Sequence, residues 1–189
     1  MGLQNISSKT RLLLHCCCAP CGSHVITLLA QSYDVTVLFY NPNIQPPEEY
    51  DKRLAALRQM LALPEYAGIA FVVGEYDPHA FKLLAAPFAD EPEGGHRCEV
   101  CFDLRLNETA RLAADGGYGC FTTTLSISPH KNARLLNAIG KKFEQAYGIE
   151  YLCADFKKQD GYKRSVELSK KYGLYRQSYC GCLPFVQER

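Results

Sequence analysis

The sequence predicts an α/β protein built on one parallel sheet of five strands, with helices on both faces. Short runs rich in β-branched and aromatic residues alternate with longer segments whose apolar residues recur every three or four positions. Such alternation produces a parallel sheet that is covered by its crossover helices. The chain has 189 residues, 47% of them hydrophobic, which suits one domain of ordinary size.

The first half of the chain predicts three strands separated by two helices. An apolar run at residues 11–16 indicates a short buried strand, and residues 22–31 show helical spacing. Residues 34–41 read Asp-Val-Thr-Val-Leu-Phe-Tyr-Asn, a β-branched and aromatic run that predicts a strand. Apolar residues three and four positions apart predict a helix at 48–63, and the run at 68–74 is typical of a strand.

The second half continues the alternation. After a helix at 78–86, residues 97–114 predict a long amphipathic helix. The apolar run at 118–125 predicts the fourth strand. The remaining elements are a helix at 131–147, a strand at 150–155 and a helix at 161–172. We expect a single domain over residues 1–189, with residues 173–189 forming a C-terminal tail.

The net charge and the hydropathy pattern limit the cellular locations and partners that we expect for the protein. The net charge of +1 argues neither for nor against nucleic acid, because a local basic patch can hide in a balanced total. No stretch approaches the roughly 18 apolar residues of a membrane helix. Residues 1–11 lack the apolar core of a signal peptide, so we expect a cytoplasmic protein without a membrane partner. In that compartment disulfides are rare, and clustered cysteines more often bind metal or carry redox equivalents.

The chain contains ten cysteines, and most of them are clustered. Closely spaced thiols repel each other once they ionise, and a metal that binds the thiolates removes this repulsion. The clusters are Cys16, Cys17, Cys18 and Cys21 after the first apolar run, Cys98 and Cys101 at the start of the long helix, and Cys180 and Cys182 near the C-terminus. The placement indicates a metal or iron–sulfur site.

Several other interpretations of the cysteines stay open at this point. Cys120 and Cys153 lie inside strand-like runs and are expected to be inert buried thiols. A structural disulfide framework is typical of shorter and more cysteine-rich secreted chains. Structural zinc would use two C-x-x-C pairs, here Cys18 with Cys21 and Cys98 with Cys101. Iron–sulfur clusters also take four thiolates, and the surplus of cysteines favours iron.

The predicted fold places the first two cysteine clusters at one edge of the sheet. Ligands of open α/β sheets bind outside the carboxyl ends of the strands. Cys16 to Cys21 follow the first strand and open a helix, whose N-terminal N–H groups and dipole lower thiol pKa values. A phosphate loop is not expected here, because cysteines replace its small polar residues and glycines. Cys98 and Cys101 are spaced to share one helix face.

The Cys180-Gly-Cys182 pair is too tight for an unstrained bridge in regular structure. Strained disulfides are easily reduced. The pair therefore indicates a reversible dithiol, with metal ligation as the alternative.

Taken together, the motifs resemble the QueH family of epoxyqueuosine reductases. They span nearly the whole chain in order and are highly specific as a set. Cys16 occupies a position where the family pattern needs no cysteine, so we expect it not to bind metal. The matching segments are His15-x-Cys17-Cys18-Ala19-Pro20-Cys21; Phe39-Tyr40-Asn41-Pro42-Asn43-Ile44 with Glu49-Tyr50; Arg97-Cys98-Glu99-x-Cys101-Phe102 with Arg105-Leu106; Thr122-Thr123-Thr124-Leu125-x-x-Ser128-Pro129-His130-Lys131; Asp155-Phe156-Lys157-Lys158 with Gly161-Tyr162; and Tyr175-Arg176-Gln177-x-Tyr179-Cys180-Gly181-Cys182.

The resemblance implies a Rossmann-like sheet of the HUP (adenine nucleotide α-hydrolase-like) type. It implies two-electron reduction of epoxyqueuosine to queuosine at the anticodon wobble position of transfer RNA, the last step of queuosine synthesis, with an external electron donor. It also implies a [4Fe–4S] cluster, a second iron and no cobalamin. The implied roles are Cys17, Cys18, Cys98 and Cys101 as cluster ligands and Cys180 with Cys182 as a redox-active pair. Cys21 is implied either to bind the second iron or to lie beside the metal ligands without binding.

Candidate proton donors for opening the epoxide are His130, Asp155, Tyr179 and His15. Aromatic and arginine side chains of the tail are expected to stack on an RNA base, and basic side chains at strand ends to contact phosphates. These groups are Tyr172, Tyr175, Tyr179 and Arg176 for stacking, and Arg97, Lys131, Lys157, Lys158 and Arg176 for phosphate.

Two other classes of function remain. One is an electron-transfer or zinc-binding module without chemistry. The other is a tRNA-thiolating ATPase, for which the phosphate loop is missing.

Overall fold

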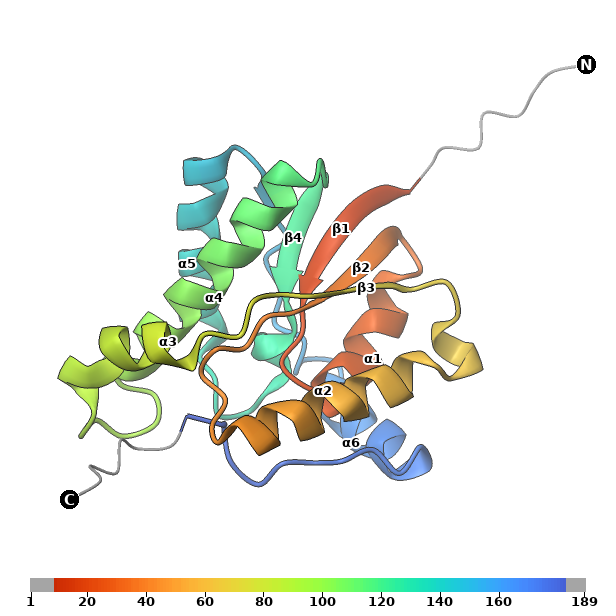
Figure 1. Cartoon of the computed structure of the whole chain (residues 1–189). Coiled ribbons are helices and arrows are strands. Elements are labelled where there is room, and N and C mark those ends of the chain that lie inside the picture. The colour runs from red at the N-terminus through yellow and green to blue at the C-terminus, as the bar shows by residue number, and fades with distance from the viewer. Residues whose placement is uncertain (1–8, 183–189) are drawn as a thin grey trace, which may run out of the picture.

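The computed structural model describes residues 9–182 and confirms the predicted α/β architecture (Figure 1). Five parallel strands form one sheet in the order β3-β2-β1-β4-β5. The strands are β1 (Thr10–His15), β2 (Tyr33–Phe39), β3 (Ala70–Val73), β4 (Cys120–Thr123) and β5 (Glu150–Tyr151). The helices are α1 (Ala19–Leu29), α2 (Pro47–Leu61), α3 (Pro78–Ala85), α4 (His96–Asp115), α5 (Ala133–Tyr147) and α6 (Gly161–Lys171), with short 3-10 turns at Pro64–Tyr66, Ala86–Phe88 and Thr124–Ile127.

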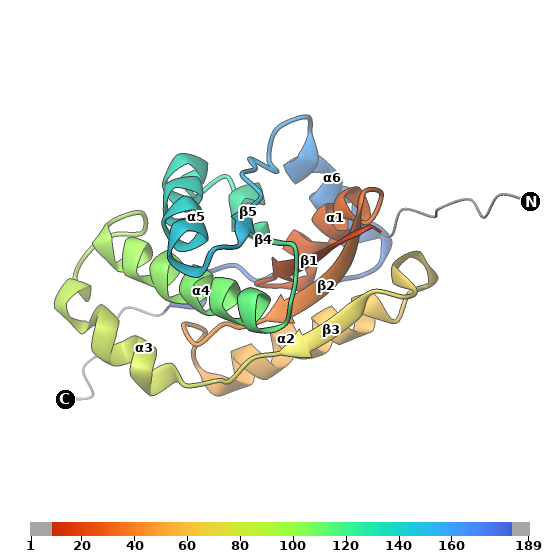
Figure 2. The same ribbon diagram turned by 90° about the horizontal axis from the view of Figure 1, so that it is seen from above.

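Helices α1 and α2 cover one face of the sheet, with α6 against α1, and helices α3, α4 and α5 lie on the other face (Figure 2). Successive side chains of a strand point to opposite faces. Leu12 and Leu14 of β1 therefore pack among side chains of α1 and α2. Leu13 packs on the other face with side chains of α3, α4 and α5. Both faces are apolar because β1 is the central strand of a sheet buried on two sides.

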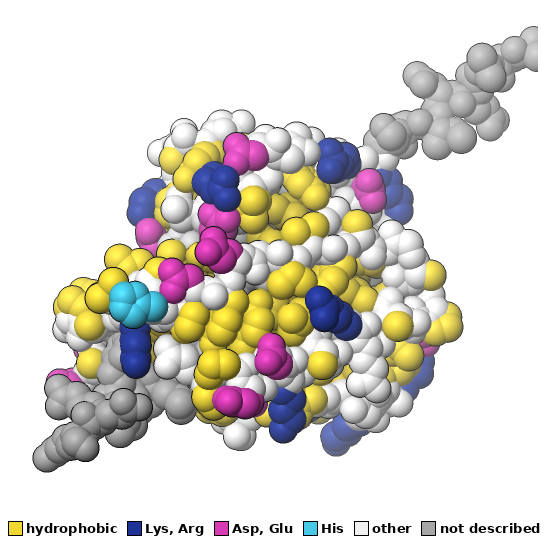
Figure 3. All heavy atoms as spheres, viewed as in Figure 1, with side chains coloured by type: hydrophobic (Ala, Val, Ile, Leu, Met, Phe, Trp, Pro, Cys, Tyr) yellow, Lys and Arg dark blue, Asp and Glu magenta, His cyan; other side chains and the backbone are white. Residues whose placement is uncertain are grey.

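Strand β3 is an edge strand and is the most exposed of the five. Figure 3 shows hydrophobic side chains gathered on this side of the molecule. Val72 and Val73 of β3 and Leu83 and Leu84 of α3 are exposed. Hydrophobic residues on a sheet edge are tolerated when the strand is short, and β3 has four residues.

Three local features differ from the sequence prediction. Helix α1 begins at Ala19 rather than at residue 22, because Pro20 is tolerated in the first turn of a helix. Strand β5 has only two residues, so Cys153 lies beyond it. Cys153 is exposed, and the prediction of a buried thiol at this position is wrong, whereas Cys120 is buried in β4 as expected.

Parts of other predictions fall outside the described residues. Residues 1–8 and residues 183–189 of the predicted tail are among these, so the tail is followed here only from residue 173 to Cys182. Within residues 9–182, no helix is both long and apolar enough to cross a membrane.

The connections define where a ligand can bind. From β1 the chain moves outward to β2 and β3, and then returns to the other side of β1 to add β4 and β5. The strand order therefore reverses between β1 and β4, and the loops that follow these two strands diverge to leave a crevice. Figure 1 shows the last described segment, in dark blue, crossing this end of the sheet.

Candidate metal centre

The loop after β1 is fixed by backbone and side-chain hydrogen bonds. The Cys16 N–H donates to Leu38 O at 2.8 Å, and Asn41 Nδ2 donates to Cys16 O at 3.0 Å. The Cys16 side chain is completely buried in the core between the sheet and α1, and its Sγ donates to Cys18 O at 3.3 Å. Cys16 is not part of the group of close sulfurs formed by Cys17, Cys18 and Cys21, which supports the expectation that it does not bind metal.

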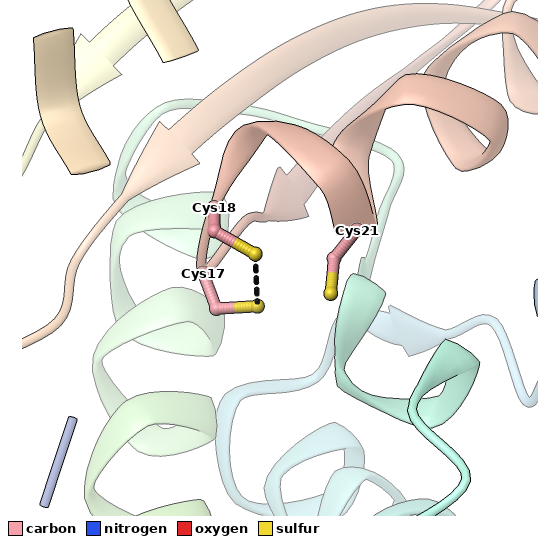
Figure 4. A group of neighbouring side chains, drawn as sticks. All are labelled: Cys17, Cys18 and Cys21. Atoms are coloured by element: carbon pink, nitrogen blue, oxygen red, sulfur yellow. Dashed lines mark hydrogen bonds between the residues drawn. The ribbon is translucent and has the colours of Figure 1, made fainter. Parts of the chain in front are cut away.

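Cys17, Cys18 and Cys21 form a compact group of thiols, which we call the loop thiols (Figure 4). Their Sγ atoms all lie within 4.8 Å of one another, and those of Cys17 and Cys18 are 3.6 Å apart. The turn needs a glycine at position 22, because a Cβ there would lie 2.9 Å from Cys16 Sγ. The loop thiols are thus brought together by backbone packing at the N-terminus of α1.

The three loop thiols differ in how readily they lose a proton. Hydrogen bonds from Cys18 and Cys21 hold the pKa of the Cys17 thiol well below its ordinary value. The hydrogen bond between Cys18 and Cys17 raises the pKa of Cys18 to about 12. Hydrogen bonds to Cys17 and Cys18 raise the pKa of Cys21 as well. The first negative charge of the group therefore lies on Cys17. Gln177 Nε2 donates to Cys18 Sγ at 3.0 Å, so the tail also contacts the loop thiols.

A second group of cysteines comes from the start of α4 and from the tail. We call Cys98, Cys101, Cys180 and Cys182 the α4–tail thiols. Cys98 Sγ accepts a hydrogen bond from Gly94 N at 3.2 Å, and Lys131 Nζ lies 3.5 Å from Cys180 Sγ. Burial raises the pKa of Cys182 to about 12, and the nearby Cys101 adds to this effect. The tail cysteines therefore lie beside the thiols of α4.

The buried guanidinium of Arg105 links the two groups of thiols. Only 2% of this residue is exposed, and its Nη1 lies 3.7 Å from Cys101 Sγ. Its Nη2 donates to Asn41 Oδ1 at 2.6 Å. Burial alone would lower the pKa of Arg105, but the charges of Cys101, Cys17 and Cys180 raise it above its ordinary value. A permanent positive charge thus lies among cysteines that come from three parts of the chain.

Arg105 also contacts the imidazole of His15, with Nε 3.2 Å from His15 Nε2. Burial, together with the charge of Arg105, lowers the pKa of His15 to about 3, so the ring is neutral at physiological pH. Because arginine only donates, this contact requires the proton on His15 Nδ1, which lies 2.8 Å from Thr123 Oγ1. The contact of Nε2 with Tyr40 O, at 3.0 Å, belongs to the other tautomer.

A cavity of about 350 Å³ opens beside the loop thiols. It contains side chains from the loop after β4, from α6 and from the tail. Cys17 and Cys21 line it from one side and Cys180 from another. The full lining consists of Cys17, Pro20, Cys21, Arg53, Glu93, Arg105, Leu125, Ile127, Ser128, Pro129, His130, Lys131, Tyr162, Ser165, Arg176, Gln177, Ser178, Tyr179 and Cys180. The cavity therefore brings thiols, two buried cations and exposed polar groups to one place.

The four candidate proton donors lie in different places, and only two of them line the cavity. His130 and Tyr179 line the cavity, but the Tyr179 hydroxyl donates to Gln45 O at 2.8 Å. His15 is buried beneath Arg105. Asp155 does not reach this cavity. It lines a second one of about 280 Å³ and pairs with Lys157 Nζ at 2.8 Å.

Only some of the side chains expected to contact RNA lie at the cavity beside the loop thiols. Lys131, Arg176 and Tyr179 line the cavity. Arg97 is buried and donates to Ala89 O, so it is not a surface cation. Lys158 lines the second cavity. The hydroxyl of Tyr172, at the end of α6, donates to Glu65, and that of Tyr175 donates to Glu49.

Sequence reasoning overlooked Arg53 and Gln177. Both line the cavity, and both contact residues more than 100 positions away along the chain, namely Arg53 with Cys180 and Gln177 with Cys18. One local signal was present for Arg53. It lies four residues after Glu49 on the face of α2 that also carries Tyr50 and Leu57, where two charged residues are unusual.

Comparison with known proteins identifies relatives over almost the whole length of the chain. Residues 12–188 match the family Epoxyqueuosine reductase QueH. The epoxyqueuosine reductase QueH of Streptococcus pyogenes serotype M1 is 41% identical over 182 residues, which cover 94% of this chain and 71% of the relative. That of Staphylococcus epidermidis is 39% identical over 180 residues, covering 93% and 76%. That of Thermotoga maritima is 37% identical over 181 residues, covering 94% and 91%.

Replacement of Arg105 by methionine tests the role of the buried cation. The change keeps much of the side-chain length but leaves Asn41 Oδ1 and the thiols without their donor, so we expect a loss of about 3 to 5 kcal/mol in unfolding free energy. Urea denaturation measures this loss. The control is Arg111→Met on the same helix, where the guanidinium forms ion pairs in solvent, and there we expect a much smaller loss. Equal losses in the two variants would contradict the role given to Arg105.

Proposed function

The chain belongs to the QueH family of epoxyqueuosine reductases, which are oxidoreductases, and we propose that it reduces epoxyqueuosine in transfer RNA to queuosine without cobalamin. The observation that carries the proposal is the convergence of Cys17, Cys21, Cys180 and the buried guanidinium groups of Arg53 and Arg105 on one cavity at the carboxyl ends of the strands. A redox reaction needs electron-carrying groups beside the substrate, and in this cavity they are sulfurs.

The proposed reaction determines how many electrons and protons the site must supply. Opening the epoxide and removing its oxygen as water leaves an alkene and consumes two electrons and two protons. A dithiol that closes to a disulfide releases two electrons and two protons, so the Cys180–Cys182 pair can supply one turnover. An external donor must then reduce the disulfide. Cys180 is the member that lines the cavity.

The cysteines fit an iron centre. Cysteine thiolates are the usual ligands of iron–sulfur clusters, and the positive charges of Arg105 and Lys131 offset the negative charge of such a centre. We propose that Cys17, Cys18, Cys98 and Cys101 hold a [4Fe–4S] cluster and that Cys21 binds a second iron. The position of Cys21 Sγ within 4.8 Å of the Sγ atoms of Cys17 and Cys18 supports a second iron next to the cluster. Bound there, the metal centre would supply single electrons and a Lewis acid for the epoxide oxygen.

The residues of the cavity have separate roles in this proposal. His130 is exposed at the cavity wall and is the proposed proton donor, while Lys131 stabilises negative charge on the oxygen. Gln177 Oε1 is buried and has no hydrogen-bond partner within residues 9–182, which makes it an acceptor for a substrate hydroxyl. Arg176, exposed at the wall, is placed to contact the RNA by stacking or through phosphate.

The direct test uses the chain purified without oxygen and a transfer RNA carrying epoxyqueuosine. With a chemical reductant we expect queuosine in the nucleoside digest, together with bound iron and sulfide and a broad visible absorption. Zinc without iron, and no queuosine, would favour the alternative of a metal-binding module without chemistry.

Serine substitutions at the proposed ligands test the cluster. Cys17→Ser, Cys18→Ser, Cys98→Ser and Cys101→Ser should each lose most of the bound iron, because a cluster takes four thiolates. Iron analysis of protein purified without oxygen measures this. Cys16→Ala and Cys120→Ala are the matched controls, and both should retain iron even where they reduce stability. Full iron content in two or more of the ligand variants would refute the assignment.

Substitutions in the tail pair test the source of the two electrons. The double variant Cys180→Ser/Cys182→Ser should keep its iron, since neither residue is a proposed ligand, and should lose multiple turnover. Product formed per enzyme over time, with the same reductant, measures this. Loss of iron would show that the pair binds metal, and unchanged steady-state turnover would show that the electrons come by another route.

A further inference from the structure

A buried ion pair lies beneath the tail. In α2, Arg53 Nε lies 2.7 Å from Glu49 Oε1, and the exposed fractions of the two side chains are 1% and 9%. Removing both charges from water is expensive, and the attraction between them offsets this only when further hydrogen bonds satisfy their remaining groups. The location of those further bonds therefore indicates what the pair holds in place.

The further hydrogen bonds all connect α2 to the tail. Arg53 Nη1 donates to Cys180 O at 2.9 Å, and Nη2 donates to Tyr179 O at 3.1 Å. The Tyr175 hydroxyl donates to the other partner of the pair, at 2.9 Å from Glu49 Oε2. We call Glu49, Arg53 and Tyr175 the tail clamp. Hydrogen bonds in which one group is charged are stronger than those between neutral groups, so the clamp is a strong constraint on a segment without helix or strand.

The residues just before α2 complete the attachment. Gln45 N donates to Gly181 O at 2.9 Å, and Gln45 O accepts from the Tyr179 hydroxyl at 2.8 Å. Gly181 has φ +106°, and a Cβ at this position would lie 3.1 Å from Arg53 Nη1. Only glycine adopts this backbone conformation readily, so the close approach of the tail to Arg53 explains the glycine between the two cysteines.

The attachment determines where the two cysteine side chains lie. With its carbonyl held by Arg53, Cys180 lines the cavity and its Sγ is 3.5 Å from Lys131 Nζ. Cys182 packs instead against the core on the α4 face, beside Cys101. The pair is thus oriented, with one sulfur facing the cavity and the other behind it.

We propose that Arg53 is a positioning residue for the Cys180–Cys182 pair. It acts through the backbone carbonyls of Tyr179 and Cys180, and so sets which sulfur faces the cavity without touching the substrate's reacting atoms. The catalytic part of this inference rests on the proposed reductase function. The placement of the tail does not, and it can be tested separately.

The test compares Arg53→Met with Arg58→Met, an exposed arginine on the same helix. The intact protein is purified without oxygen, treated with iodoacetamide, and analysed peptide by peptide. Loss of the two charged hydrogen bonds should increase the alkylation rates of Cys180 and Cys182 by about tenfold or more, while the rate at Cys120 stays unchanged. Arg58→Met should match the wild type.

Activity gives the second measurement. In Arg53→Met we expect kcat to fall by about tenfold or more, with a smaller change in KM, because a loosened pair delivers electrons less often while the substrate contacts outside the tail remain. Unchanged alkylation rates in folded Arg53→Met would overturn the proposal. Faster alkylation with unchanged kcat would overturn the positioning role and leave a purely structural one.

A milder variant covers the case in which Arg53→Met does not fold. Tyr175→Phe removes one hydrogen bond to Glu49 and leaves the buried pair intact, so it should increase Cys180 alkylation to a smaller extent. An unchanged rate in this variant would also count against the clamp. If the wild type shows no reduction of epoxyqueuosine, the proposed function fails, and the alkylation rates still decide the placement of the tail.

Discussion

The positive charge of Arg105, buried where the strands end, is the interaction on which the geometry of this site depends. Its guanidinium contacts His15 at the end of β1, Asn41 after β2 and Cys101 in α4. Two of these partners extend the network, since Asn41 holds the carbonyl of Cys16 and His15 contacts Thr123 at the end of β4. One side chain therefore fixes the relative positions of two strand ends, the cysteine loop and the helix that carries the second pair of cysteines.

The same charge explains how so many thiols can lie close together. An arginine cannot lose its proton in a protein, so thiolates formed around it are stabilised whatever the pH. Cys17 already has a lowered pKa, whereas those of Cys18 and Cys21 are raised. Metal ligation requires all of these sulfurs to be deprotonated, so metal binding must release protons and becomes weaker as the pH falls. The site is therefore arranged for an anionic sulfur centre that a buried cation offsets.

Much of the fold followed from the sequence because its signals are local. Alternating strand and helix patterns predicted five parallel strands, and the short apolar run before Cys16 placed the loop thiols at a strand end. Features that depend on distant contacts did not follow. Cys153 lies beyond β5, which ends after two residues, and is exposed, and Asp155 lines a second cavity rather than the one beside the loop thiols. The contact of Arg53 with the tail joins residues 127 positions apart along the chain. The one local sign of this contact was the presence of charged residues on the buried face of α2.

The two kinds of cysteine are supported in physically different ways. The loop thiols are fixed by packing between the central strand and α1, with Cys16 and Gly22 in direct contact, and such packing allows little movement. Cys180 and Cys182 lie on a segment without helix or strand, whose attachments include hydrogen bonds to Arg53 and Gln45. Hydrogen bonds of this kind can break locally without unfolding the core. A metal centre needs fixed ligands, whereas a dithiol must change its geometry each time the bond between its sulfurs forms or breaks. The division of the cysteines between a rigid loop and an attached tail therefore matches the two roles proposed for them.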